Sequence, residues 1–290
     1  MADYRILTDS CCDLTADMVE ELNLRVLPLS FTMNGKTYKN YSDGREMDNA
    51  TFYGHIKNGA MPTTSQVNPD EWESAFDEIL ANGEDLLALV FSSGLSGTYQ
   101  SACIARETMA EKYPDRKIVV IDTLCAALGQ GLLVYLTAQK KADGASIEEA
   151  AAYAESLIPQ LDHWIAVDDL FHLKRGGRVS AASAVMGTML SIKPIIHVDN
   201  AGKLIPVHKI RGRRQSLDYL VKKAAELAVN PEEQTMFICN SHCLEDAEYV
   251  KQQLKKTLHP KKVIIGDIGP VIASHTGLGT LAVFFLGKER

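Results

Sequence analysis

Short unbroken apolar runs alternate with amphipathic segments through the first half of the chain. One such run, 86–91, has the length of a strand and contains no polar residue. This pattern is typical of a strand that is buried on both faces of a sheet. Further strands are expected at 5–7, 26–31 and 117–122. Because helical spacing separates these runs, the alternation predicts a doubly wound α/β fold with a mostly parallel sheet.

The helices expected in this half begin at capping residues or at proline. Asn34-Gly35 predicts a tight turn that folds 37–39 back as a hairpin arm. The stretch 62–66 has no apolar periodicity and is expected to be a polar loop. The predicted helices cover about 15–22, 48–56, 69–80, 98–109, 124–141 and 146–161.

The pattern of strands changes after residue 160. Runs at 192–198 and 203–207 flank Asp199-Asn200-Ala201-Gly202, which predicts a hairpin and therefore a mixed sheet. The rest of this half is expected to contain helices at 215–229 and 245–258 and strands at 236–240 and 263–266. A chain of 290 residues fits two domains. We expect an N-terminal α/β domain over 1–160, a C-terminal α/β domain over 161–290, and the site in the cleft between them.

Composition narrows the class of protein. Hydrophobic residues make up 46% and charged residues 23% of the chain, which is typical of a globular protein. The formal net charge of −7 argues against nucleic acid as a partner. The N-terminus lacks the pattern of a signal peptide, and no apolar run approaches the ~18 residues of a membrane span. Six unpaired cysteines indicate reduced thiols, so a cytoplasmic protein is expected.

The main candidate for a binding site is the turn that follows the apolar run 86–91. It reads Ser92-Ser93-Gly94-Leu95-Ser96-Gly97-Thr98 and leads into a helix that Ser96 or Thr98 is expected to cap. In a parallel sheet such a turn lies at the carboxyl ends of the strands, where ligands bind. Free backbone N–H groups and the helix dipole favour an anion there. A capped helix start without a ligand has the same local pattern.

Four other segments carry polar groups suited to an anion. Thr8-Asp9-Ser10 ends the first strand, and a proline followed by three hydroxyl residues and Gln66 precedes a helix. A basic, glycine-containing stretch over 170–179 includes Arg178, and His275 with Thr276 lies among small residues. No phosphate-loop lysine, nucleophile elbow or complete dinucleotide fingerprint is present. Cysteine and histidine spacing predicts no metal site.

Together these motifs resemble those of the DegV family of bacterial fatty-acid-binding proteins, in order along the whole chain. The matching segments are Thr8-Asp9-Ser10, 62–66, 92–102, 173–178, Lys193-Pro194 and 269–277. The resemblance implies that the protein holds one long-chain fatty acid in an apolar tunnel, with its carboxylate at the domain interface. It further implies a binding subunit without cofactor or catalytic activity of its own, which presents the acid to an ATP-dependent fatty acid kinase for acyl phosphate formation.

The resemblance also assigns the head-group contacts. The carboxylate is expected near the hydroxyls of Thr64 (or Thr63) and Ser93, with Arg178 facing the transferred phosphoryl group or the kinase. The tunnel is expected to be lined from 184–190 and 124–136. The residues expected to bind the ligand are Thr63, Thr64, Ser65, Ser93, Gly94, His275 and Thr276.

Two alternatives accompany these expectations. The same turns would suit an enzyme acting on a small phosphorylated or carboxylated metabolite, with His275 as acid or base and Arg178 as electrophile. A cleft that is polar throughout would favour this enzyme.

A basic cluster is a candidate for transient contact with an anionic membrane surface, and a solvated helix start is the alternative. The cluster consists of Lys209, Arg211, Arg213 and Arg214.

Overall fold

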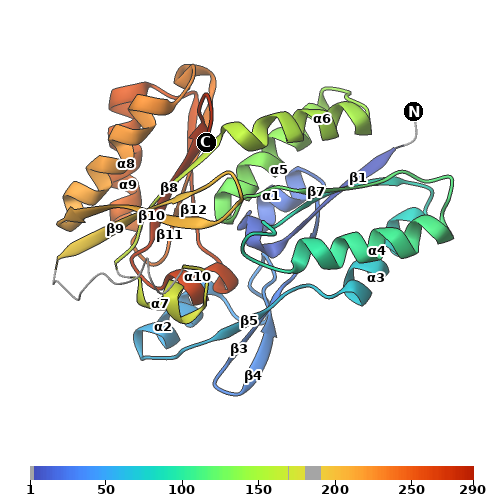
Figure 1. Cartoon of the computed structure of the whole chain (residues 1–290), viewed down its shortest axis with the longest axis horizontal. Helices are drawn as coiled ribbons and strands as arrows, with labels where there is room; N and C mark the ends of the chain where they lie inside the picture. Colours follow the sequence, from blue (N-terminus) through green and yellow to red (C-terminus); the bar gives the residue numbers. More distant parts are fainter. Residues whose placement is uncertain (1–2, 169, 180–190) are drawn as a thin grey trace.

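The computed structural model describes residues 3–168, 170–179 and 191–290, and its strands form three sheets (Figure 1). The first sheet has four strands, and all of its neighbouring pairs are parallel. In spatial order the strands are β2 (Arg25–Leu27), β1 (Tyr4–Asp9), β6 (Asp85–Val90) and β7 (Ile118–Asp122). The predicted parallel sheet is therefore confirmed.

Helices cover both faces of this sheet because its central strand β6 is apolar on both sides. Leu86, Ala88 and Val90 join the core under one pair of helices, whereas Leu87 and Leu89 join the core under the other pair. The helices are α3 (Pro69–Leu80) and α4 (Thr98–Lys112) on the first face, and α5 (Ala127–Ala142) and α6 (Ile147–Leu157) on the second.

The second sheet is mixed, as the hairpin at 199–202 predicts. Only β11 and β12 pair in parallel; the other pairs are antiparallel. In spatial order the strands are β10 (Leu204–Arg211), β9 (Ile192–Val198), β8 (Leu161–Ala166), β13 (Leu281–Leu286), β11 (Thr235–Asn240) and β12 (Lys262–Asp267). The domain boundary at residue 160 stays a prediction.

Helix α5 lies between the two large sheets (Figure 1). Its apolar side chains pack with Leu87 of the parallel sheet and with Phe237 and Phe284 of the mixed sheet. The opposite face of the mixed sheet is covered by α8 (Arg213–Leu227) and α9 (Leu244–Leu258). The order of layers is therefore helices, parallel sheet, helices, mixed sheet, helices.

The predictions of one strand at 26–31 and of a loop at 62–66 are wrong, because parts of both segments form a small antiparallel sheet. It consists of β4 (Lys36–Lys39), β3 (Ser30–Met33) and β5 (Thr63–Ser65). The single strand expected at 26–31 is two strands in different sheets, because Pro28 has no N–H to continue a ladder. The polar loop expected at 62–66 contains β5, in which Thr64 pairs with Phe31.

The remaining helices are short. They are α1 (Ala16–Glu21), α2 (Asn49–Lys57), α7 (Phe171–Arg175) and α10 (Pro270–Thr276), with single 3-10 turns η1 (Ser10–Cys12), η2 (Ile158–Gln160) and η3 (Pro231–Glu233). The N-cap of α4 is Gly97 rather than Ser96 or Thr98. Within the described ranges, no helix has the length and hydropathy needed to cross a membrane.

Candidate functional site

A cavity of about 360 Å³ lies between the carboxyl end of β6 and the inner face of the mixed sheet. Most of its wall is apolar, and representative lining side chains are Phe91, Leu173, Leu204, Ala282 and Phe284. Its volume is within the range of small-molecule sites. The chain therefore encloses an apolar space at the sheet edge where the polar turns were expected to converge.

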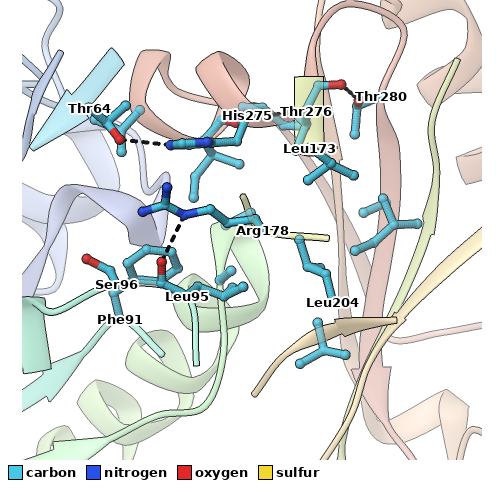
Figure 2. A pocket seen from close by; sticks show the side chains of 18 of the residues that line it. Thr64, Phe91, Leu95, Ser96, Leu173, Arg178, Leu204, His275, Thr276 and Thr280 are labelled. Carbon is cyan, nitrogen blue, oxygen red and sulfur yellow. Dashed lines mark hydrogen bonds between the residues drawn. The ribbon is translucent and has the colours of Figure 1, made fainter. Parts of the chain in front are cut away.

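Polar side chains gather at one end of this cavity. Figure 2 shows Thr64, Ser96, Arg178 and His275 together on one side, with Leu173, Leu204 and Thr280 on the other. The Thr64 hydroxyl oxygen lies 2.8 Å from Nε2 of His275, and either group donates according to the imidazole tautomer. The cavity is thus most polar at one end, and the rest of its wall is mostly apolar apart from His163, Thr276 and Thr280.

His275 is held neutral at this end. Burial, together with the nearby Arg178 and Arg175 guanidinium groups, lowers the pKa of His275 from 6.5 to about 4. Its second ring nitrogen, Nδ1, is buried without a hydrogen-bond partner. A neutral imidazole beside two arginines forms a site in which an arriving anion meets positive charge and a hydrogen-bonding ring.

The basic glycine turn positions both Arg178 and His275. A side chain at Gly176 would strike Nδ1 of His275, so only glycine lets the end of α7 pack this closely on α10. Gly177 has φ +72°, a turn that brings Arg178 back over the cavity. There Nε of Arg178 donates to the carbonyl of Leu95 at 3.1 Å, which joins this turn to the loop after β6 (Figure 2).

Arg175 connects the elements that surround the polar end of the cavity. Its guanidinium donates to the carbonyl oxygens of Pro62 at 3.3 Å and Ser274 at 3.1 Å. These bonds connect α7 to the segment that enters β5 and to α10. Arg175 therefore stabilises the approach of Thr64 to His275 without lining the cavity among the described residues.

Gln66 joins β5 to α4. Its amide nitrogen donates to Oγ of Ser101 at 2.7 Å. The side chain runs so close to Gly97 that a Cβ there would overlap the Gln66 amide oxygen. Gln66, Ser96 and Gly97 all line the cavity. The two hydroxyl-rich segments are thus in direct contact, as their expected convergence on one ligand requires.

The structure does not place Ser93, Gly94 or Thr63 in the cavity wall. Ser92 donates its hydroxyl to the carbonyl of Gly202 at 2.8 Å, and a Cβ at Gly94 would lie 2.6 Å from the carbonyl oxygen of Ala201. This part of the turn therefore packs against the β9–β10 hairpin. Ser93 is exposed on the outer side, with its backbone N–H bonded to a carboxylate.

Of the expected ligand-binding residues, the cavity wall includes Thr64, Ser65, His275 and Thr276, together with Arg178. Ser96, in the same turn as Ser93, is the hydroxyl that the sequence interpretation missed. The serine-rich motif indicates the region of the site, but only the fold of the turn determines which of its serines faces the cavity. An apolar wall was expected, but most of its residues were not identified, because core and cavity side chains have the same composition.

Two further expectations need correction. Thr8-Asp9-Ser10 does not reach the cavity: Asp9 is buried, where its Oδ2 accepts the N–H of Phe91 at 2.7 Å and an amide proton of Gln130 at 3.2 Å. Of the predicted lining segment 124–136, only Ala126 and Ala127 line the cavity. The other predicted lining segment, 184–190, lies outside the described residues.

The basic cluster near α8 is partly neutralised. Nε of Arg213 lies 2.8 Å from a carboxylate oxygen of Asp246, and its guanidinium also approaches Asp168 at 3.8 Å. These pairs tie the start of α8 to neighbouring elements. Membrane contact through this cluster stays a prediction.

The structure is a mixed α/β fold whose four-stranded parallel sheet and six-stranded mixed sheet flank a largely apolar cavity. The chain belongs to the DegV family, because a family model described as "Uncharacterised protein, DegV family" matches residues 3–288.

Relatives agree with this assignment over their full lengths. A DegV domain-containing protein of Clostridium perfringens is 46% identical over 290 residues, which cover 100% of this chain and 99% of the relative. A solved DegV family protein from Thermus thermophilus, described by its fatty acid binding, has a TM-score of 0.88 at 30% identity, with 99% and 100% of the two chains covered. DegV of Bacillus subtilis, described as a fatty acid binding protein, has a TM-score of 0.84 at 27% identity, with 99% and 100% covered.

Proposed function

We propose that this protein binds one long-chain fatty acid, with the acyl chain in the apolar cavity and the carboxylate at its polar end. The observation that carries the proposal is the uneven polarity of the cavity: Thr64, Ser96, Arg178 and His275 gather at one end of a wall that is otherwise mostly apolar. Two structural relatives that are described as fatty-acid-binding support it.

The energetics favour an acyl chain over a small polar ligand. Burying ~14 methylenes at ~0.8 kcal/mol each contributes on the order of 11 kcal/mol before association costs. Hydrogen bonds to the head group add about 1–3 kcal/mol. The acyl chain therefore determines most of the affinity, and the polar end determines which way the acid points.

Each polar group has a distinct role in this proposal. The hydroxyls of Thr64 and Ser96 donate to the carboxylate, and Arg178 supplies a positive charge within the wall. The neutral His275 donates its Nε2 proton to the Thr64 oxygen, which leaves the Thr64 hydroxyl proton for the carboxylate, and a bound anion favours protonation of the ring. Ser65 and Thr276 also line the cavity.

We further propose that the protein acts in the cytoplasm as the acyl-presenting partner of an ATP-dependent fatty acid kinase, with no catalysis of its own. This step rests on the family resemblance of the motifs. Arg178 supports it, because its guanidinium lies at the head-group end where phosphoryl transfer to the carboxylate would take place. The apolar wall argues against the alternative of an enzyme for a small metabolite, which would need a cleft polar throughout.

Lipid extraction tests the binding proposal, and a coupled assay tests the kinase proposal. Organic extraction of the purified protein followed by mass spectrometry should release about one fatty acid per chain, and delipidated protein should rebind palmitate or oleate. Arg178→Ala should then impair acyl phosphate formation by an added fatty acid kinase more than it impairs binding. A lipid-free protein that binds neither acid contradicts the first proposal. Normal binding without any phosphorylation contradicts only the second.

A further inference from the structure

A second, smaller cavity of about 120 Å³ lies where three connections meet, and it shares no lining residue with the acyl cavity. Asp13 follows η1, Asn40 follows β4, and Asp267 ends β12. The polar side chains that line it are those of Ser10, Asp13, Thr15, Asn40, Tyr41, Ser42, Asn49 and Asp267.

Two of these side chains carry polar groups without a hydrogen-bond partner among the described residues. Oδ1 of Asp13 accepts the backbone N–H of Gly269 at 3.0 Å, but Oδ2 is buried and has no hydrogen-bond partner. Asn40 is only 7% exposed, and its backbone N–H donates to the carbonyl of Leu29 at 2.8 Å. Its carboxamide lines the cavity and makes no hydrogen bond within the described part of the chain. Buried carboxylate oxygens are normally bonded, so the free Oδ2 of Asp13 beside this carboxamide indicates a ligand.

Gly269 shows that the side chains of Asp13 and Asn40 lie close together. A Cβ at this glycine would lie 2.7 Å from Oδ1 of Asp13 and 3.2 Å from Nδ2 of Asn40. The Asp13 carboxylate and the Asn40 carboxamide therefore stand side by side above the start of α10. Either rotation of the carboxamide presents one polar atom on the side of the Asp13 carboxylate.

The charge around this cavity is negative. Asp13 and Asp267 line it, and the described lining includes no lysine, arginine or histidine. A larger polar cavity adjoins it through Asn49 and Asp267 and adds the carboxylates of Glu245 and Asp246, of which the second is paired with an arginine. Oxygen atoms of carboxylates and carboxamides in a negative surrounding suit a cation rather than an anion.

We propose that this cavity is a binding site for a hard divalent cation, held by carboxylate oxygens of Asp13 and Asp267 and carboxamide oxygens of Asn40 and Asn49. Mixed charged and neutral oxygen ligands completed by water are typical of Ca²⁺. The described residues contain no group of three His, Cys, Asp or Glu side chains able to hold a metal, so the carboxamides are essential to the donor set. The cation braces the start of α10, the helix that carries His275.

Terbium luminescence of the full-length, chelator-treated protein tests this proposal, because Tb³⁺ replaces Ca²⁺ and Tyr41 in the cavity wall can sensitise its emission. We expect a saturable signal from one ion per chain that Ca²⁺ displaces. The apparent affinity should fall at least tenfold in Asp13→Asn, which can keep the bond to Gly269, and in Asn40→Ala. Asp70→Asn, an exposed carboxylate outside the cavity, is the matched control and should bind as the parent does.

The outcomes separate clearly. Displacement by Ca²⁺ alone, or equally by Mg²⁺, supports a divalent site and identifies its ion. The absence of a saturable signal, displacement by K⁺ at the same concentrations, or equal affinity in the parent and in both folded variants would overturn it. Thermal unfolding of each variant establishes that it is folded, and two variants at different connections guard against the failure of one.

Discussion

The hydroxyl oxygen of Thr64 lies 2.8 Å from Nε2 of His275, although 211 positions separate the two residues in the sequence. Thr64 comes from the small sheet beside the parallel sheet, and His275 comes from the helix that leads into β13 of the mixed sheet. The polar end of the cavity is therefore assembled from both ends of the chain. A ligand carboxylate at this place would contact both.

Thr64→Ala should weaken fatty acid binding by about 1–2 kcal/mol, or roughly 5- to 30-fold in Kd. The substitution removes a hydroxyl that faces the cavity and the hydrogen bond that orients His275. Titration calorimetry with oleate measures the change. Thr63→Ala, at the exposed neighbouring position of β5, is the control and should leave Kd unchanged. Equal effects of the two substitutions would contradict this assignment.

Ser96→Ala should weaken binding more than Ser93→Ala. Ser96 lines the cavity, whereas Ser93 is exposed on the outside of the same turn. We expect a loss of about 1 kcal/mol for Ser96→Ala and a change within error for Ser93→Ala, measured by the same titration. The reverse order would restore Ser93 as the head-group contact and would show that the turn rearranges on binding.

The sequence predicted most of the fold because apolar periodicity determines strands and helices locally. The buried run of β6, the capped helix α3 and the β9–β10 hairpin all form where expected. The wrong predictions concern segments whose conformation depends on pairing with a strand from elsewhere in the chain. Pro28 splits one apolar run between two sheets, and the polar segment of β5 becomes a strand only because β3 offers it a partner.

The site could be predicted only in outline, for a geometric reason. A hydroxyl-rich turn identifies a region, but the direction of each side chain depends on what packs behind it. Here the hairpin carbonyls of Ala201 and Gly202 occupy the side of Ser92 and Gly94, which leaves Ser96 to face the cavity. The role of Gly176 likewise depends on its contact with His275, almost a hundred positions away.

Gly176→Ala should impair binding through His275. The added methyl would overlap Nδ1 of the imidazole, so the ring must move away from Thr64. We expect at least a tenfold rise in the Kd for oleate with a folded protein. Gly54→Ala in α2, where an added methyl meets nothing within 4 Å, is the matched control and should bind normally. Unchanged binding by Gly176→Ala would show that the position of His275 is not critical.

His275 should also make stability depend on pH. Its folded pKa of about 4 lies below 6.5, so the unfolded state binds more protons between these values. The free energy of unfolding of the lipid-free protein should therefore decrease as the pH falls from about 6.5 toward 4. Asp9 has the opposite effect on the free energy of unfolding. Burial raises its pKa from 3.8 to about 6, so the folded state binds more protons between these values.

Comparison with His275→Gln isolates the histidine contribution, since Asp9 is present in both proteins. Chemical denaturation at several pH values should give a shallower decrease below pH 6.5 for the variant. Parallel curves for the two proteins would show that His275 titrates normally in the folded state.

Ala282→Leu should shorten the acyl chain that the protein accepts. Ala282 lies in β13 and lines the apolar wall, so a larger side chain there occupies part of the cavity. We expect the Kd for a C18 acid to rise by at least tenfold while that for a C10 acid changes little, because each buried methylene contributes ~0.8 kcal/mol. A uniform loss across chain lengths would indicate a general distortion of the sheet instead.

A crystal structure of the protein with a bound long-chain fatty acid tests the central claim most directly. The account predicts continuous elongated density in the apolar cavity, with the carboxylate within hydrogen-bond distance of Thr64 and His275 and the methyl end among the side chains near Phe284. A fatty acid bound elsewhere on the protein, or in this cavity with its carboxylate at the apolar end, would contradict it.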